Sequence, residues 1–211
     1  MRQINRSKPK PDGRETRRVA TRDRLILAAK SVMADTSVDT VTVDGIVQKA
    51  GVGKGSFYNH FNSKEDLFFA TLDEVFADMA DQIISAIEAV DDPAEELAIG
   101  IRMYVRLAAA DPEIGRLIIN APASFDILHT YADPVVNHTI DKGLQAERFK
   151  LRDRDLFFLL LTSGVNATLS RVLEQTFDEA VTKELAASAL LLAGIDPKEA
   201  LEIASKSLPT L

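Results

Sequence analysis

The feature that most constrains the fold is a pair of short helical patterns separated by only three residues, Gly51-Val52-Gly53. Thr42 opens the first pattern, which runs to residue 50. Gly51 directly follows the last periodic residue, where glycine takes the left-handed conformation that ends a helix. The second pattern covers residues 54–61. Two short helices joined this closely predict a helix-turn-helix. The inner face of the first helix consists of Val43, Ile46, Val47 and Ala50.

The rest of the chain also repeats its apolar residues with the period of a helix. We expect a helix of about 14 residues from Thr21 and a helix over 65–89, capped by Ser63 with Asp66 as its partner. Pro134 lies inside a helical pattern and should kink or end it. No stretch alternates apolar and polar residues as a strand would, so the sequence predicts an all-α fold of about nine or ten helices. Further helix starts are expected at residues 92–93, 111–112, 124, 153, 178 and 196–197.

Composition excludes several classes of protein. The 211 residues include no cysteine, which excludes disulfides, thiolate metal sites and a cysteine nucleophile. Residues 1–24 lack the apolar region of a signal peptide. The uncharged run 156–170 is shorter than the roughly 20 residues of a membrane span, so a buried helix explains it better. We therefore expect a soluble, cytoplasmic protein with no membrane partner.

Charge is distributed unevenly along the chain. The net charge is −7, but residues 1–64 carry 13 basic and 6 acidic side chains, against 12 and 26 in residues 65–211. A basic N-terminal part on an acidic body can bind phosphate while the body stays off the DNA. We expect residues 1–20 to form a flexible basic arm. It is either a solvated tail or a segment that follows the DNA backbone or enters the minor groove.

The second short helix has one apolar face and one hydrogen-bonding face. Phe57 and Phe61 are four residues apart, so they share a face and should pack inward. The opposite face carries polar side chains, and Gly55 lets the backbone approach a partner closely. The Gly-Lys pair at 53–54 is not part of a phosphate-binding loop, because the opening glycine, the hydroxyl after the lysine and the preceding strand are all missing. The polar face consists of Lys54, Ser56, Tyr58 and Asn59.

The run from Thr42 to Phe61, followed by Asn62-Ser63-Lys64-Glu65-Asp66-Leu67, resembles the signature of the TetR family of transcriptional regulators. The resemblance covers residues 21–72. It implies an N-terminal three-helix DNA-binding domain over 21–72 and a C-terminal helical domain for ligand binding and dimerisation over 73–211. It also implies a ligand-responsive regulator, a repressor that binds a palindromic operator as a homodimer and is released by a small-molecule effector.

The resemblance assigns roles to individual residues as well. The expected base readers are Lys54, Ser56 and Asn59, while Thr42 caps the first helix of the motif. Gly53 stands where the family commonly has a serine, so a side-chain cap is missing there. Val47 stands where a smaller alanine is usual. The full DNA-binding set is Thr42, Gly53, Lys54, Gly55, Ser56, Tyr58, Asn59, His60 and Lys64.

Three residues of this set, Tyr58, His60 and Lys64, are expected to donate to phosphates, and each has an alternative. Tyr58 could instead be an aromatic anchor of the core, and His60 a histidine at the core edge bonded to a carbonyl. Lys64 could be an ordinary solvated charge. The motif does not depend on any one of the three.

The resemblance implies a dimer interface made by helices 152–176 and 178–194, and a pocket inside the middle helices. Polar groups on otherwise apolar helices are suited to orienting a ligand. For His129 and Asn166 a satisfied polar group in a core or interface is an equal alternative. The pocket candidates are Met103, Tyr104, Leu107, Phe125, His129, Phe158, Thr162 and Asn166.

Other functions receive less support from the sequence. We expect no enzyme, because no nucleophile–base pair or paired carboxylates stand in a suitable loop. We expect no cofactor and no metal site; His138 and Asp141 alone make a weak pair. The alternative function is a DNA-binding regulator or architectural protein without a small-molecule ligand.

Overall fold

The computed structural model describes residues 13–35, 40–120, 124–174 and 178–209, with side chains from residue 16 onward except for 124–133. These residues form ten α-helices and no strand, which confirms the all-α prediction. The helices are α1 (Gly13–Asp35), α2 (Val43–Ala50), α3 (Lys54–Tyr58), α4 (Lys64–Ile87), α5 (Pro93–Ala110), α6 (Pro112–Asn120), α7 (Ser124–Gln145), α8 (Arg154–Glu174), α9 (Glu179–Leu192) and α10 (Pro197–Ser205).

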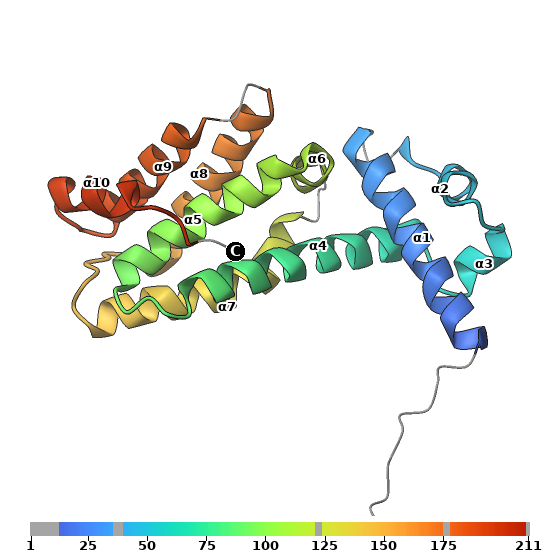
Figure 1. Cartoon of the computed structure of the whole chain (residues 1–211), viewed down its shortest axis with the longest axis horizontal. Helices are drawn as coiled ribbons and strands as arrows, with labels where there is room; N and C mark the ends of the chain where they lie inside the picture. The colour runs from blue at the N-terminus through green and yellow to red at the C-terminus, as the bar shows by residue number, and fades with distance from the viewer. Residues whose placement is uncertain (1–12, 36–39, 121–123, 175–177, 210–211) are drawn as a thin grey trace, which may run out of the picture.

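The three N-terminal helices form a head that is joined to a larger helical body by α4 (Figure 1). The first turns of α4 pack in the head, where Leu25, Phe57 and Leu67 are fully buried. Further along, α4 packs against α5 and α7 in the body. One helix therefore connects the two parts, and α6 provides a second contact by packing against α1.

Within the body, α5 is the central helix. It packs against α4, α6, α7, α8, α9 and α10, and Val105 and Ala108 on it are completely buried. The C-terminal helices α8, α9 and α10 lie together on the side of α5 away from α4 (Figure 1). The core is thus layered around α5.

Short side chains at the helix starts explain where the elements begin. Asp92, Asp178 and Asp196 each cap a helix, accepting the N–H of the residue two positions later at 3.0, 2.9 and 2.9 Å. These starts confirm the sequence prediction. Ser63 accepts the N–H of Asp66 at 3.1 Å, as expected. The Asp66 carboxylate, however, reaches Asn62 N, one residue earlier than a capping box requires.

Two helix boundaries differ from the prediction. The first helix begins at Gly13 rather than Thr21, so part of the expected arm 1–20 is helical, and residues 1–12 lie outside the described part of the chain. Propagating a helix adds one hydrogen bond per residue, so a helix formed at 21–35 extends readily into residues 13–20. The second helix of the motif ends at Tyr58, not at 61. Helix α7 continues through Pro134, so of the two expected outcomes, a kink or an end, the helix does not end there; it packs on α4 and α5.

Among the described helices, α8 alone is long and apolar enough to cross a membrane by length and composition. Its buried residues Phe157, Leu161 and Leu169 pack in the body, where α8 contacts α5, α6 and α9. One face of α8 thus packs in the core of the body, while other apolar side chains on it are exposed.

Candidate nucleic-acid interface and internal cavity

Local hydrogen bonds fix the angle between α2 and α3. Thr42 Oγ1 accepts the N–H of Gly45 at 3.2 Å, which confirms the predicted cap of α2. Gly51 has φ of 63°, the left-handed conformation that the sequence predicts. The N–H of Val52 donates to the Val47 carbonyl at 3.0 Å and closes the turn. Gly53 occupies the cap position of α3 and makes no side-chain hydrogen bond, because glycine has no hydroxyl to offer.

Aromatic packing holds one face of α3 against the head. Phe57 is fully buried and Phe61 nearly so, with ring centroids 6.0 Å apart, which confirms that both pack inward. Tyr58 meets the Phe57 ring edge-on at 5.2 Å but keeps 53% of its surface exposed. It is therefore not an anchor of the core, and its hydroxyl is free to meet a partner from solvent.

The outer face of α3 is accessible, as a DNA reader requires. Lys54, Gly55 and Asn59 are exposed, and Ser56 and His60 are half-buried. N-terminal residues of a recognition helix are the ones that reach base edges in the major groove. The predicted base readers are thus all at least partly accessible to a duplex.

Two of the expected DNA contacts are already paired within the protein. Lys54 Nζ lies 2.9 Å from Asp44 Oδ1, and this hydrogen bond raises the pKa of Lys54. Lys64 Nζ donates to the Val41 carbonyl at 3.0 Å, and its side chain is 23% exposed. Lys64 is therefore not an ordinary solvated charge, because it ties the start of α4 to the segment before α2. Lys64 Nζ also lies 3.9 Å from Glu65 Oε1 on the same first turn of α4.

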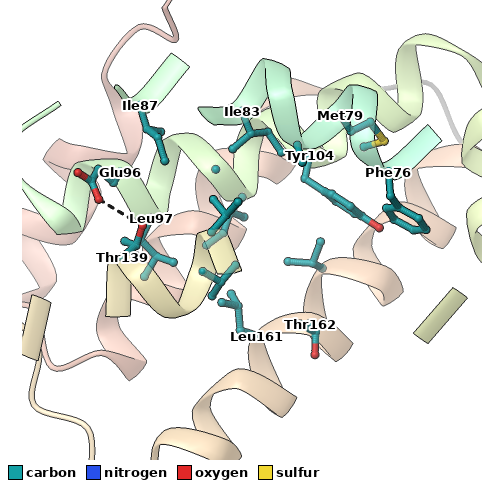
Figure 2. Close-up of a pocket in the computed structure, with 16 residues that line it drawn as sticks. Phe76, Met79, Ile83, Ile87, Glu96, Leu97, Tyr104, Thr139, Leu161 and Thr162 are labelled. Atoms are coloured by element: carbon teal, nitrogen blue, oxygen red, sulfur yellow. Dashed lines mark hydrogen bonds between the residues drawn. The ribbon is translucent and has the colours of Figure 1, made fainter. Parts of the chain in front are cut away.

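The body contains a largely apolar, partly open cavity of about 100 Å³ between α4, α5, α7 and α8. Phe76, Met79 and Ile83 on α4 form one wall (Figure 2). They face Leu97 and Tyr104 on the next helix, α5, and the other walls come from α7 and α8. The remaining lining residues are Ala80, Ile87, Glu96, Gly100, Ile101, Val135, Val136, Thr139, Leu161, Thr162 and Val165.

Two of the predicted pocket residues, Tyr104 and Thr162, line this cavity. A third, Asn166, does not line the cavity, but its Oδ1 accepts a hydrogen bond from the hydroxyl of Tyr104 at 3.4 Å. Burial raises the pKa of Tyr104, so its hydroxyl keeps its proton.

The other residues predicted to line the pocket either lie away from the cavity or have side chains outside the described part of the chain. Met103 and Phe158 are buried and Leu107 half-buried, and none of them lines this cavity, so their contact with a ligand stays a prediction. The side chains of Phe125 and His129 lie outside the described residues. Successive helical residues are rotated by 100°, which explains why Tyr104 reaches the cavity while Met103 points into the core.

Sequence reasoning missed the contribution of α4. Phe76, Met79 and Ile83 recur at helical spacing, and this signal is shared by any helix that faces a core. Only the tertiary arrangement shows that their face borders an open space.

A buried charged group lies at one end of the cavity. Glu96 is 5% exposed and forms an ion pair with Lys142. Its Oε2 accepts from the Thr139 hydroxyl at 3.2 Å (Figure 2). Lys142 Nζ also donates to the Val90 carbonyl at 3.2 Å, in the turn between α4 and α5. These bonds connect this end of the cavity to the segment that follows α4.

The surface of α8 and α9 carries large apolar side chains that no described part of the chain covers. Leu156, Leu159 and Leu160 on α8 are each about half exposed, as are Leu191 and Leu192 on α9. The two helices pack against each other. Their leucines form an apolar surface of the kind that marks an interaction site.

Two family descriptions match the chain. Residues 25–71 match "Bacterial regulatory proteins, tetR family". Residues 92–206, more than half of the chain, match "Tetracyclin repressor-like, C-terminal domain". The first covers the head with α2 and α3, and the second covers the body from the cap of α5 to the end of α10.

Curated relatives are similar over part of their length. The regulator BetI of Rhizobium meliloti is 32% identical over 92 residues, which is 44% of this chain and 45% of BetI. The regulator EthR of Mycobacterium tuberculosis is 31% identical over 99 residues, 44% of this chain and 46% of EthR. The matched segments thus span less than half the length of these relatives.

Solved structures are similar over nearly the whole chain. RolR in complex with resorcinol is 31% identical with a TM-score of 0.75, covering 93% of this chain and 98% of RolR. FadR of Bacillus halodurans, described as a fatty acid degradation regulator, is 22% identical with a TM-score of 0.71, covering 87% and 97%. At that identity FadR supports the fold alone.

Proposed function

The chain belongs to the TetR family of bacterial transcriptional regulators, and from this premise we propose that it is a repressor whose operator affinity is controlled by a small-molecule effector. The observation that carries the proposal is the two-sided geometry of α3. Phe57 is buried in the head while Lys54 and Asn59 on the same short helix remain exposed. A helix held from one side and bare on the other is what major-groove reading requires.

The DNA contacts proposed for this surface divide into two kinds. Lys54, Ser56 and Asn59 read base edges, whereas Tyr58, His60 and Lys64 donate to phosphates. The basic excess of residues 1–64 supports the phosphate contacts, since it attracts the duplex irrespective of sequence.

We propose that the protein acts as a homodimer through α8 and α9. Four helices, two from each protomer, would cover the exposed leucines of α8 and α9. Exposed Ser163 and Ala167 continue the same side of α8 and allow close approach of a second helix. A symmetric dimer would then place two copies of α3 on one side of a palindromic operator.

We propose that the cavity is the effector site and that α4 carries its signal. The wall formed by Phe76, Met79 and Ile83 belongs to the helix whose first turn holds Lys64 against the head. A ligand that favours a different position of α4 would change the spacing of the two recognition helices. Coupling of about 1–3 kcal/mol changes DNA affinity roughly 5- to 150-fold. The resorcinol complex of RolR supports a small molecule in a body of this shape.

Selection of bound fragments from random duplex DNA tests the DNA-binding part of the proposal. The expected product is a palindrome whose half-sites are about 10 base pairs apart or a multiple of that. No affinity for any duplex at low ionic strength would refute the assignment.

An engineered disulfide between α4 and α7 tests whether α4 must move for the effector to act. The chain has no cysteine, so the two introduced cysteines can pair only with each other. In the locked protein the effector should no longer release DNA.

A DNA-binding protein without a ligand is the second candidate. The cavity argues against it, because well-packed cores leave few voids larger than a water molecule. Thermal unfolding against a panel of metabolites separates the two, since a sensor is stabilised by the molecule that it binds.

A further inference from the structure

The side chains that line the cavity in the described part of the chain offer hydrogen-bond acceptors rather than donors, and this restricts the chemistry of the molecule that fits it. Four polar side chains line it among the described residues: Glu96, Tyr104, Thr139 and Thr162. A bound molecule exchanges hydrogen bonds with water for bonds with these groups, so its affinity depends on what each group still has available.

The three lining hydroxyls each direct their single proton to a protein oxygen. Thr162 Oγ1 donates to the Phe158 carbonyl at 2.9 Å. Thr139 Oγ1 donates to Glu96 at 3.2 Å, and the Tyr104 hydroxyl donates to Asn166 at 3.4 Å. A hydroxyl has one proton and two lone pairs, so each of them keeps the capacity to accept.

Glu96 adds further acceptor capacity and no donor. Its two oxygens receive one proton each, from Lys142 and from Thr139. A carboxylate has about four lone-pair sites, and half of them remain available. Lys142 donates to Glu96 and to the Val90 carbonyl, and it is not among the residues that line the cavity. The backbone N–H groups of the lining residues lie within helices and are used there.

We infer that the cavity takes an uncharged molecule with an apolar body and at least one O–H donor, a phenol or an alcohol. This inference rests on the proposed effector role of the cavity. The apolar walls bind the body of the molecule. A carboxylate or phosphate would bring only acceptors and its own charge into an apolar space beside Glu96, which is strongly unfavourable. A ketone or an ether is neutral, but it too would find no free donor among the lining side chains that the structure describes.

Matched neutral probes test the inference by calorimetric titration of the full-length protein. Resorcinol and 1-octanol carry O–H donors on a ring and on a chain. Their partners 1,3-dimethoxybenzene and 2-octanone have similar skeletons and only acceptors, and octanoate adds a charge. We expect the donor of at least one pair to bind about tenfold more tightly than its partner, or better. The two pairs also distinguish a ring from a chain.

The result cannot be explained by apolar burial alone, because replacing hydroxyl groups by methoxy groups makes the ring more apolar. If 1,3-dimethoxybenzene or 2-octanone binds as tightly as its partner, or if octanoate binds most tightly, the inference is overturned while the effector role stands. If none of the five binds to protein that still binds DNA, both the inference and the effector role of this cavity are refuted.

Glu96→Gln should shift the preference of the cavity towards the acceptor probes, an effect that a damaged cavity would not produce. The amide introduces two N–H donors where the carboxylate had none. We expect the variant to bind 2-octanone or 1,3-dimethoxybenzene several-fold more tightly than the parent protein does. A misfolded cavity would lose affinity for every probe, so Tyr104→Phe serves as the comparison: it removes a lining hydroxyl and should weaken only the donor probes. Unchanged preferences in both variants would contradict the inference.

Discussion

Lys54 Nζ lies 2.9 Å from Asp44 Oδ1, so the first residue of the recognition helix is paired with an acid on the preceding helix. Both side chains are more than half exposed. The pair therefore lies on the surface that we expect to meet DNA. Asp44 would face the phosphates of the duplex, and Lys54 must exchange this partner for one on the DNA.

Asp44→Asn should strengthen binding to duplex DNA of any sequence. The change removes a negative charge from the interface and frees Lys54 for the DNA. We expect affinity to rise several-fold at low salt, and the slope of log affinity against log salt to steepen by about one. Fluorescence anisotropy over a salt series measures both quantities. Asp81→Asn, an equal change of charge at an exposed site on α4 in the body, is the control, and equal gains in the two variants would contradict the explanation.

Leu160→Glu should separate the proposed dimer. The leucine is 48% exposed on α8, and a charge there would be buried without a partner in a four-helix interface. Analytical ultracentrifugation should show a monomer with unchanged helical content and weakened operator binding. Leu27→Glu makes the same substitution at a leucine on α1 that is 66% exposed, and it should leave the dimer intact. A dimer that survives Leu160→Glu would place the interface elsewhere.

Arg102→Ala should destabilise the body by about 3–5 kcal/mol. Arg102 is 1% exposed on α5. It donates to Glu179 on α9 at 2.7 Å and to the Lys206 carbonyl after α10 at 2.6 Å. Its removal leaves both acceptors unpaired and opens a void in the core. Glu179→Gln should cost less, because the amide oxygen still accepts from Arg102 and the side chain at this position is 52% exposed. Urea unfolding of the two variants gives the comparison, and equal losses would argue against it.

The sequence predicts the framework of this fold better than its internal space. The aspartates at 92, 178 and 196 identify helix starts, because capping is a local interaction between residues two positions apart. The pairing of Lys54 with Asp44 is not local; it depends on how the turn at Gly51 places two helices. The cavity is even harder to predict from the sequence, because a helix face that borders a void has the same apolar pattern as one that borders a core.

Replacing glycine by alanine should have opposite effects on stability at Gly100, which lines the cavity, and at Gly115, which is closely packed. A Cβ at Gly100 would lie 3.8 Å from Ile83 Cγ2, an ordinary contact on a wall of the cavity. A Cβ at Gly115 on α6 would lie 2.6 Å from the Ala108 carbonyl oxygen, closer than atoms can approach.

Gly100→Ala should therefore raise the free energy of unfolding by roughly 0.5–1 kcal/mol, as expected for alanine in place of glycine inside a helix. Gly115→Ala should lower it by about 1–3 kcal/mol, because the backbone of α5 or α6 must shift to make room. Urea unfolding measures both changes. The extra methyl at Gly100 also occupies cavity space, so the variant should bind the effector less tightly despite being more stable. A loss of stability in Gly100→Ala, or a gain in effector affinity, would mean that this wall does not face an open cavity.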